Sequence, residues 1–206
     1  ANTTASNNTA VGYQALYANT NGPNTAVGAA ALYTNTTGYA NNAFGVSALR
    51  LNTTGTNNVA IGDNALYSNT TASYNTAVGY QSGYAVSGAY HVSIGYQSLY
   101  NQSANASVAV GYQAAYYMNG GSNEAIGYQA MVGASAATSS GTQNSAIGRQ
   151  ALFSLTSGNN NIGLGYQAGY SNTTGGANNF VGVYAGYANT TGTYNTALGT
   201  QALYSN

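Results

Sequence analysis

Apolar residues recur along the chain in a short fixed pattern, with polar residues between them. The segment NTAVGYQALY at 8–17 returns with few changes at 24–33, 75–84 and 195–204. With its central glycine as reference, twelve copies fill the chain at intervals of 16 or 17 residues and one of 21. This self-similarity is the signature of a repeat architecture. We therefore predict that residues 1–206 form a single repeat array, and because the pattern is already under way at Ala1, a segment of a longer chain.

The residue before each central glycine is large and apolar in all twelve units. This regularity predicts one buried file of side chains through the whole molecule. The residue two positions before the glycine is small in eleven of twelve units, and Ala or Ser always stands three positions after it. The predicted buried file consists of Val11, Val27, Phe44, Ile61, Val78, Ile94, Val110, Ile126, Ile147, Leu164, Val181 and Leu198.

Two polar motifs predict corners between the apolar stretches. Asn stands four positions before the glycine in ten of twelve units, and His91 and Ser107 replace it in the others. Asn tolerates left-handed backbone angles and bonds to neighbouring backbone, so it suits a turn, and stacked turns would form an Asn ladder. The second motif is NTTG at 35–38, 52–55, 172–175 and 189–192.

The stretches between these corners, such as TAVG and YQALY, are too short for helices of ordinary length and rich in β-branched and aromatic residues. They predict an all-β fold, a β-solenoid (parallel β-roll) of about 12 coils with roughly 17 residues per coil. Each coil would carry two short strands. Stacking at roughly 4.8 Å per coil would give a rod about 58 Å long.

Tyrosines follow the same period. Nine of twelve units have Tyr five positions after the glycine, and half have another directly after it. Stacked coils would align these rings into stripes larger than the apolar patch of a few hundred Å² that a monomer usually exposes. We therefore expect other copies of the chain to cover them.

Charge is almost absent, since only 2% of residues are charged where an ordinary soluble domain has about 25%. Two arginines cannot neutralise a nucleic-acid backbone, and no apolar run approaches the ~20 residues of a membrane span. The single proline excludes collagen. Hydrophobic residues make up 44% of the chain at fixed places, which argues for packing and against disorder.

Few residues offer catalytic chemistry. The lone His91 lies in the Asn file, and we interpret it as a corner residue, because a catalytic base needs a partner nearby. Asp63 and Glu124 would lie roughly four coils, or ~19 Å, apart, too far for a glycosidase pair or a shared metal. Arg50 and Arg149 are interpreted as surface or inter-chain contacts. We therefore predict no enzyme activity and no catalytic, cofactor-binding or metal residues.

Two further features concern the corners. Nine N-x-Ser/Thr sequons arise from the composition, and in a glycosylating host the NTT corners would carry the sugars as exposed turns. The 21-residue interval includes GASAATSSGTQ at 133–143, for which a tolerated bulge is favoured over a protruding loop. The sequons begin at Asn2, Asn7, Asn35, Asn52, Asn69, Asn101, Asn105, Asn172 and Asn189.

NNVAIG at 57–62, SVAVG at 107–111 and NSAIG at 144–148 resemble the N-S-V-A-I-G head repeats of trimeric autotransporter adhesins, shared by repeat shafts of phage tail fibres. The resemblance implies a left-handed parallel β-roll, three chains per fibre, and display on a cell surface or virion for attachment to a receptor or glycan. Three units read N-T-A-V-G, at 8–12, 24–28 and 75–79, and this form is one residue shorter than that motif.

The sequence thus predicts a structural segment of an extracellular fibre or filament that associates with itself through Tyr, Ala and Asn ladders. The expected partners are copies of the chain and a cell-surface or glycan receptor, with neither nucleic acid nor membrane insertion. Two alternatives stay open: an ice-binding solenoid with a Thr- and Asn-rich face, and a secreted amyloid-like fibril whose subunits stack end to end.

Overall fold

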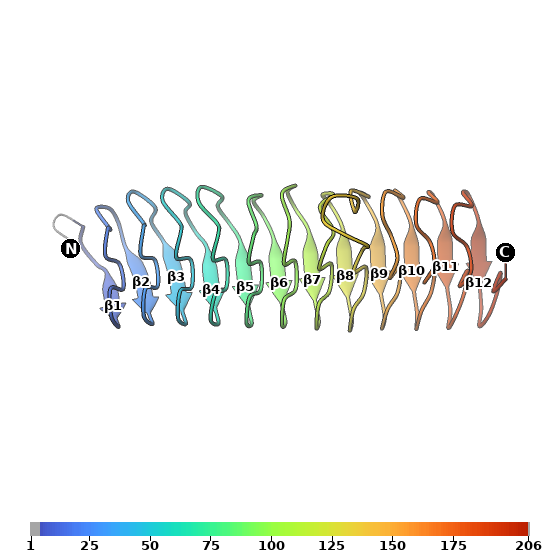
Figure 1. Ribbon diagram of the computed structural model, residues 1–206, viewed down its shortest axis with the longest axis horizontal. Helices are drawn as coiled ribbons and strands as arrows, with labels where there is room; N and C mark the ends of the chain where they lie inside the picture. Colours follow the sequence, from blue (N-terminus) through green and yellow to red (C-terminus); the bar gives the residue numbers. More distant parts are fainter. Residues whose placement is uncertain (1–4, 206) are drawn as a thin grey trace.

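The computed structural model describes residues 5–205 and shows a straight rod of stacked coils, with β1 and β12 at opposite ends (Figure 1). All twelve strands pair in parallel, in sequence order, in one sheet, and residues 5–205 contain no helix. The predicted β-solenoid is confirmed. The strands are β1 (Thr9–Val11), β2 (Asn24–Val27), β3 (Asn41–Phe44), β4 (Val59–Ile61), β5 (Thr76–Val78), β6 (Val92–Ile94), β7 (Val108–Val110), β8 (Glu124–Ile126), β9 (Ser145–Ile147), β10 (Ile162–Leu164), β11 (Asn179–Val181) and β12 (Thr196–Leu198).

Each coil contains one strand, so the expectation of two strands per coil is wrong. The YQALY segment returns across the back of the coil with left-handed residues two and four positions after the glycine. Leu66 has φ of 49° and Gln81 has φ of 52°, which no β-strand allows. The returning segments still stack through backbone bonds, since the Leu32 N–H donates to the Ala48 carbonyl at 3.0 Å.

The large apolar residues before the glycines do not form a buried file, and this prediction is also wrong. Ile61 is 42% exposed and Leu164 is 43% exposed, whereas Ala60, one position before Ile61, is fully buried. Successive residues of a strand point to opposite faces. The small residue two positions before the glycine points inward, so the large one must point outward. The outward side chains nevertheless remain aligned from coil to coil, because every strand pair keeps the same register, as in Ala60↔Ala77.

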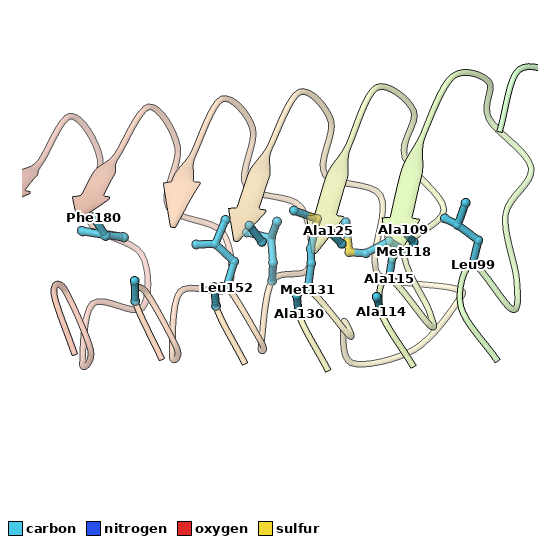
Figure 2. Close-up of a cluster of buried hydrophobic side chains, with 14 of the residues drawn as sticks. Leu99, Ala109, Ala114, Ala115, Met118, Ala125, Ala130, Met131, Leu152 and Phe180 are labelled. Atoms are coloured by element: carbon cyan, nitrogen blue, oxygen red, sulfur yellow. The ribbon is translucent and has the colours of Figure 1, made fainter. Parts of the chain in front are cut away.

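The core is a thin layer between the strands and the returning segments. Alanines come from the strands, and larger side chains come from the position four residues after the glycine. Figure 2 shows Leu99, Met131 and Leu152 in this layer, with Ala109 and Ala125 on the strands. The fully or almost fully buried large residues of this file are Leu16, Leu32, Leu49, Leu66, Leu99, Met131 and Leu152.

Phe180 shows that this layer has a fixed volume. It is the one large residue at an otherwise small strand position, and it is fully buried. The positions that face it carry glycine where seven of the other ten coils have leucine. A Cβ on Gly169 would lie 2.6 Å from the Phe180 ring, and one on Gly186 would lie 2.2 Å from it. The ring therefore occupies space that two missing side chains leave free.

A cluster of buried hydroxyls divides the apolar core into two parts, one from Leu16 to Val86 and one from Leu99 to Ala197. The Ser82 hydroxyl donates to the Ser93 carbonyl at 2.7 Å and lies 3.1 Å from the Ser98 hydroxyl. Buried polar groups are tolerated only when they are hydrogen-bonded, and these satisfy one another. The core is therefore polar over a short section near the middle of the rod, and its packing continues through that section.

The central glycines are required where the coils touch. Gly45 has φ of 136°, and a Cβ on it would lie 2.5 Å from the carbonyl of Gly62 in the next coil. Side chains are disfavoured at this φ, and a Cβ would in addition separate the two coils. Glycine is therefore repeated because backbone meets backbone along this file.

The extra residues between β8 and β9 are looped out, and the loop departs from the outline of the other coils (Figure 1). The strands keep their register, with Glu124 opposite Ser145. The Ser139 hydroxyl closes the loop by accepting the Ala134 N–H at 3.0 Å. The insertion is thus accommodated at the corner without disturbing the sheet.

Candidate interaction surfaces

The predicted Asn ladder is confirmed, and it lies inside the chain. The Asn58 N–H donates to Asn41 Oδ1 at 3.0 Å, and Asn58 Oδ1 accepts the Asn75 N–H at 3.0 Å. Asn58 Nδ2 donates to the Ala72 carbonyl at 3.0 Å. Each buried amide thus binds the coils on both sides, and these side chains are not available to a second chain.

A second ladder occupies the NTT corners. Asn52 Nδ2 donates to Asn35 Oδ1 at 2.7 Å and to the Gly55 carbonyl at 3.0 Å. Because sugar attachment requires a free Nδ2, the expectation of sugars on the NTT corners is wrong for the folded rod. The buried sequon asparagines are Asn35, Asn52, Asn69, Asn172 and Asn189, whereas Asn7 and Asn105 are exposed, Asn101 is half-buried, and Asn2 lies outside the described residues.

The outer face of the sheet exposes a continuous row of apolar residues. The aliphatic residues before the glycines project from it in one straight file, which we call the aliphatic file. Ile94 is 39% exposed and Ile126 is 40% exposed. Thr76, Val92 and their equivalents form a second, mixed file on the same face. Sequence reasoning identified these residues but placed them in the interior.

Tyrosines stack in two stripes, as the repeat predicted; the first extends with interruptions from Tyr17 to Tyr204, and the second stacks from Tyr80 to Tyr128. The first stripe, five positions after the glycine, includes Tyr84 and Tyr100, whose ring centroids lie 5.0 Å apart at an interplanar angle of 5°. The second stripe, directly after the glycine, includes Tyr96 and Tyr112 at 5.2 Å. Where rings stack on each other, they present edges and hydroxyls to the outside, not open faces.

The two arginines of the chain each stand within one stripe. The Arg50 guanidinium lies 5.8 Å from both the Tyr33 and the Tyr67 ring centroid, in the first stripe. Arg149 lies 5.3 Å from Tyr128 and 5.9 Å from Tyr166, in the second stripe. Cations interact favourably with aromatic faces at these distances. The arginines thus continue the stacks where a tyrosine is missing.

Burial raises the pKa of the Tyr100 and Tyr116 phenols above the ordinary value of 10.0, and neighbouring phenols raise it further. These hydroxyls therefore stay protonated at any neutral pH. This part of the first stripe is an uncharged surface.

A glutamine ladder adjoins the second stripe, and sequence reasoning missed it. Gln97 Nε2 donates to Gln81 Oε1 at 2.8 Å, and Gln113 Nε2 donates to Gln97 Oε1 at 3.0 Å. The signal was present in the repeated Tyr-Gln pair. These half-buried amides also bind coil to coil, and so they fix the spacing of the tyrosines beside them.

His91 is a corner residue, as predicted. Its side chain is almost fully buried, its backbone N–H donates to Asn75 Oδ1 at 2.9 Å, and its Nδ1 accepts the Ser107 N–H at 3.1 Å. Burial lowers the pKa of His91 below 6.5, and backbone groups of Ser107 and Ala104 offset this only in part. The imidazole therefore replaces the Asn acceptor in its neutral form.

We expect the rod to lose stability as the pH falls through 6.5 and below. The unfolded chain binds a proton on His91 at a higher pH than the folded chain, so acid favours unfolding, and full stability is present above 6.5. Thermal unfolding between about pH 8 and pH 5, a range set by the ordinary His pKa, measures this. The matched variant His91→Asn restores the ladder residue of the other coils, and its melting temperature should vary much less over the same range.

The acidic residues serve local roles and lie apart. Asp63 Oδ1 accepts the Val46 N–H at 2.8 Å, and the Glu124 carboxylate accepts the Ser145 hydroxyl. They belong to the coils of β4 and β8, so the structure does not bring them together. Within residues 5–205 no cluster of three His, Asp or Glu side chains could hold a metal ion.

The threonines of the NTT corner are engaged in stacking. The hydroxyls of Thr36 and Thr53 donate at 3.0 Å to the carbonyls of Thr53 and Thr70, each one coil further along the chain. Because these hydroxyls already donate to protein carbonyls, they do not favour the ice-binding alternative. A shallow groove at another corner is lined by Asn159, Asn160, Thr174, Gly176, Ala177, Thr193 and Tyr194.

Comparison with protein-family models, with curated proteins and with solved structures gives no match for this chain. None of the described residues belongs to a helix with the length and apolarity needed to cross a membrane.

Proposed function

We propose that the chain is a structural segment of an extracellular fibre or filament, in which rods associate side by side and support attachment to a receptor or glycan. The observation that carries this proposal is the aliphatic file, which extends unbroken along the outer face of the whole sheet. An exposed apolar surface of this extent marks a contact surface in a soluble protein.

The internal ladders show which surfaces of the rod are left for contact between copies. The Asn and Ala files are buried within the chain, so the aliphatic file and the tyrosine stripes are the surfaces left for association. With a formal net charge of zero and four charged side chains, little repulsion opposes contact between copies. The repeated coils make the surface as long as the rod, which suits a shaft more than a site for one small ligand.

We expect the purified chain to form oligomers, and the double variant Ile94→Glu/Ile126→Glu to reduce them to monomers. Both side chains are half exposed, so the change should cost the single rod little stability, whereas two carboxylates in an apolar contact would be strongly unfavourable. Analytical ultracentrifugation measures the result, with thermal unfolding to confirm the fold.

The control for this experiment is Thr190→Glu, an exposed residue on the NTT corner. This variant should leave association unchanged. A wild-type chain that stays monomeric at high concentration, or a double variant that associates as the wild type does, would contradict the proposed function. Thermal hysteresis by such a monomer would instead support ice binding.

A further inference from the structure

We propose that two copies of this chain pack with their outer sheet faces together and their rods antiparallel, related by a two-fold axis parallel to the strands that passes between β6 and β7. This inference depends on the proposed function, because it specifies the lateral contact between rods. The partner is therefore a second copy, and its orientation follows from the positions of the charged side chains.

Asp63 and Arg149 lie at positions that favour the antiparallel orientation. Both directly follow the central glycine, so both lie on the file of the second tyrosine stripe, along one rim of the sheet face. Asp63 follows β4 and Arg149 follows β9. Within one chain they are five coils, or ~24 Å, apart and cannot pair. They are the two charged residues of this file, and they have opposite signs.

An antiparallel pair brings these charges together twice. Rotation about the proposed axis places β4 of one copy opposite β9 of the other. It also places the edge that carries the second tyrosine stripe of one copy beside the same edge of the other copy. Asp63 of each copy then lies beside Arg149 of the second copy. Arg149 is already exposed at the rim, between the rings of Tyr128 and Tyr166, so its guanidinium is oriented before the second copy arrives. Such complementarity fixes the register of an interface.

A parallel pair or trimer lacks this compensation. In it every coil lies level with its own equivalent, so Asp63 is level with Asp63 and Arg149 with Arg149 of each other copy. The opposite charges remain ~24 Å apart. Unpaired charges at a contact are costly, whereas the antiparallel register leaves neither rim charge unpaired.

Glu124 is accommodated by the same register. It lies on the mixed file of β8, which faces β5 of the second copy, where the equivalent residue is Thr76. The carboxylate already accepts the Ser145 hydroxyl, and the Thr76 hydroxyl of the second copy can supply another donor. In this way the remaining acid also meets a hydrogen-bonding group.

The apolar contact is large enough for a stable pair. The register places Ile61 opposite Ile147, Val78 opposite Ile126, and Ile94 opposite Val110 in the aliphatic file. Twelve strands ~4.8 Å apart make the contact ~53 Å long, and strands of about three residues, each rising ~3.3 Å, make it about 10 Å wide. The pair would bury on the order of 1,000 Å² in total before the tyrosine rims are counted, which reaches the size of specific interfaces.

The test uses the absence of cysteine from the chain. Asp63→Cys and Arg149→Cys are prepared separately and treated with a bismaleimide that spans about 10 Å, the spacing of packed sheets. We expect a mixture of the two variants to give at least about tenfold more cross-linked dimer than either variant alone. Peptide mapping should place the link between positions 63 and 149.

Charge reversal gives an independent readout. Asp63→Arg alone and Arg149→Asp alone should each weaken association by about tenfold or more, because like charges then meet at both of the 63–149 contacts. The double variant Asp63→Arg/Arg149→Asp should recover affinity to within about threefold, since the pairs are restored with reversed signs. Thermal unfolding of each variant controls for the loss of the Val46 contact at Asp63.

The outcomes separate the two proposals. Efficient cross-linking of one cysteine variant with itself, or a charge-reversed pair that does not recover affinity, would overturn the antiparallel arrangement while association itself stands. A wild-type chain that is monomeric in ultracentrifugation would overturn both. Cross-linking only in the mixture, with recovery in the double variant, supports the antiparallel pair.

Discussion

Replacing Gly111 with alanine is expected to destabilise the rod by about 4 kcal/mol or more, a loss that only the most damaging single substitutions cause. Gly111 has φ of 138°, and a Cβ on it would lie 2.4 Å from the carbonyl oxygen of Gly127. That oxygen is part of the next coil, whose backbone is fixed by its own ladders, so it cannot move aside locally. The two coils would have to separate.

The matched control is Gly199→Ala. Gly199 has a similar φ of 119°, but no atom lies within 4 Å of its Cβ position, because no described coil follows it. This variant carries the backbone strain alone, about 1–3 kcal/mol. The difference between the two losses, from denaturant unfolding, reports the contact between coils together with the central position of Gly111 in the array. Equal losses of stability in the two would contradict the explanation that stacking requires glycine.

Replacing Asn58 with alanine is the second large effect, with an expected loss of about 3–5 kcal/mol. The change removes the acceptor of the Asn75 N–H and the donor to the Ala72 carbonyl, both buried. Each buried polar group left without a partner costs about 1–3 kcal/mol. The small cavity left by the amide adds to this loss. The free energy of unfolding from urea denaturation measures the effect.

Two controls sharpen this prediction. Asn42→Ala changes an exposed asparagine one coil earlier and should be nearly neutral. Asn58→Ser should fall between the two, because a serine hydroxyl already holds this ladder at Ser107, where it accepts the Asn123 N–H at 3.3 Å. If Asn58→Ala were no worse than Asn42→Ala, the ladder would not stabilise the rod as the geometry indicates.

The loss of stability from the Gly111 or Asn58 substitution should extend to neighbouring coils. Each coil contacts only its neighbours, as the consecutive pairing of β1 to β12 shows. In such arrays the coils before and after a weak coil no longer stabilise each other through it. A defect at Gly111, near the middle, therefore interrupts the array more than one at Gly199. The hydroxyl cluster around Ser82 and Ser93 already divides the apolar core close to this point.

Much of the interaction surface could be predicted from sequence, but its orientation could not. The tyrosine period identified the stripes correctly, and the Asn period identified the inner ladder, with His91 and Ser107 as members. The aliphatic file was identified but assigned to the interior, because large apolar residues are usually the buried ones. The charge relation between Asp63 and Arg149 became visible only once each coil had a fixed position along the rod.

The sequence by itself determined the repeat, the stacking of one coil per repeat and the places of the corners, because these depend on spacing alone. Only the tertiary structure decided which side of each strand faces inward. Alternation allows either the alanine or the following aliphatic residue to be buried. The choice is made by the returning segment, whose left-handed residues turn Leu32, Leu66 and their equivalents into the core and leave room only for alanine opposite them.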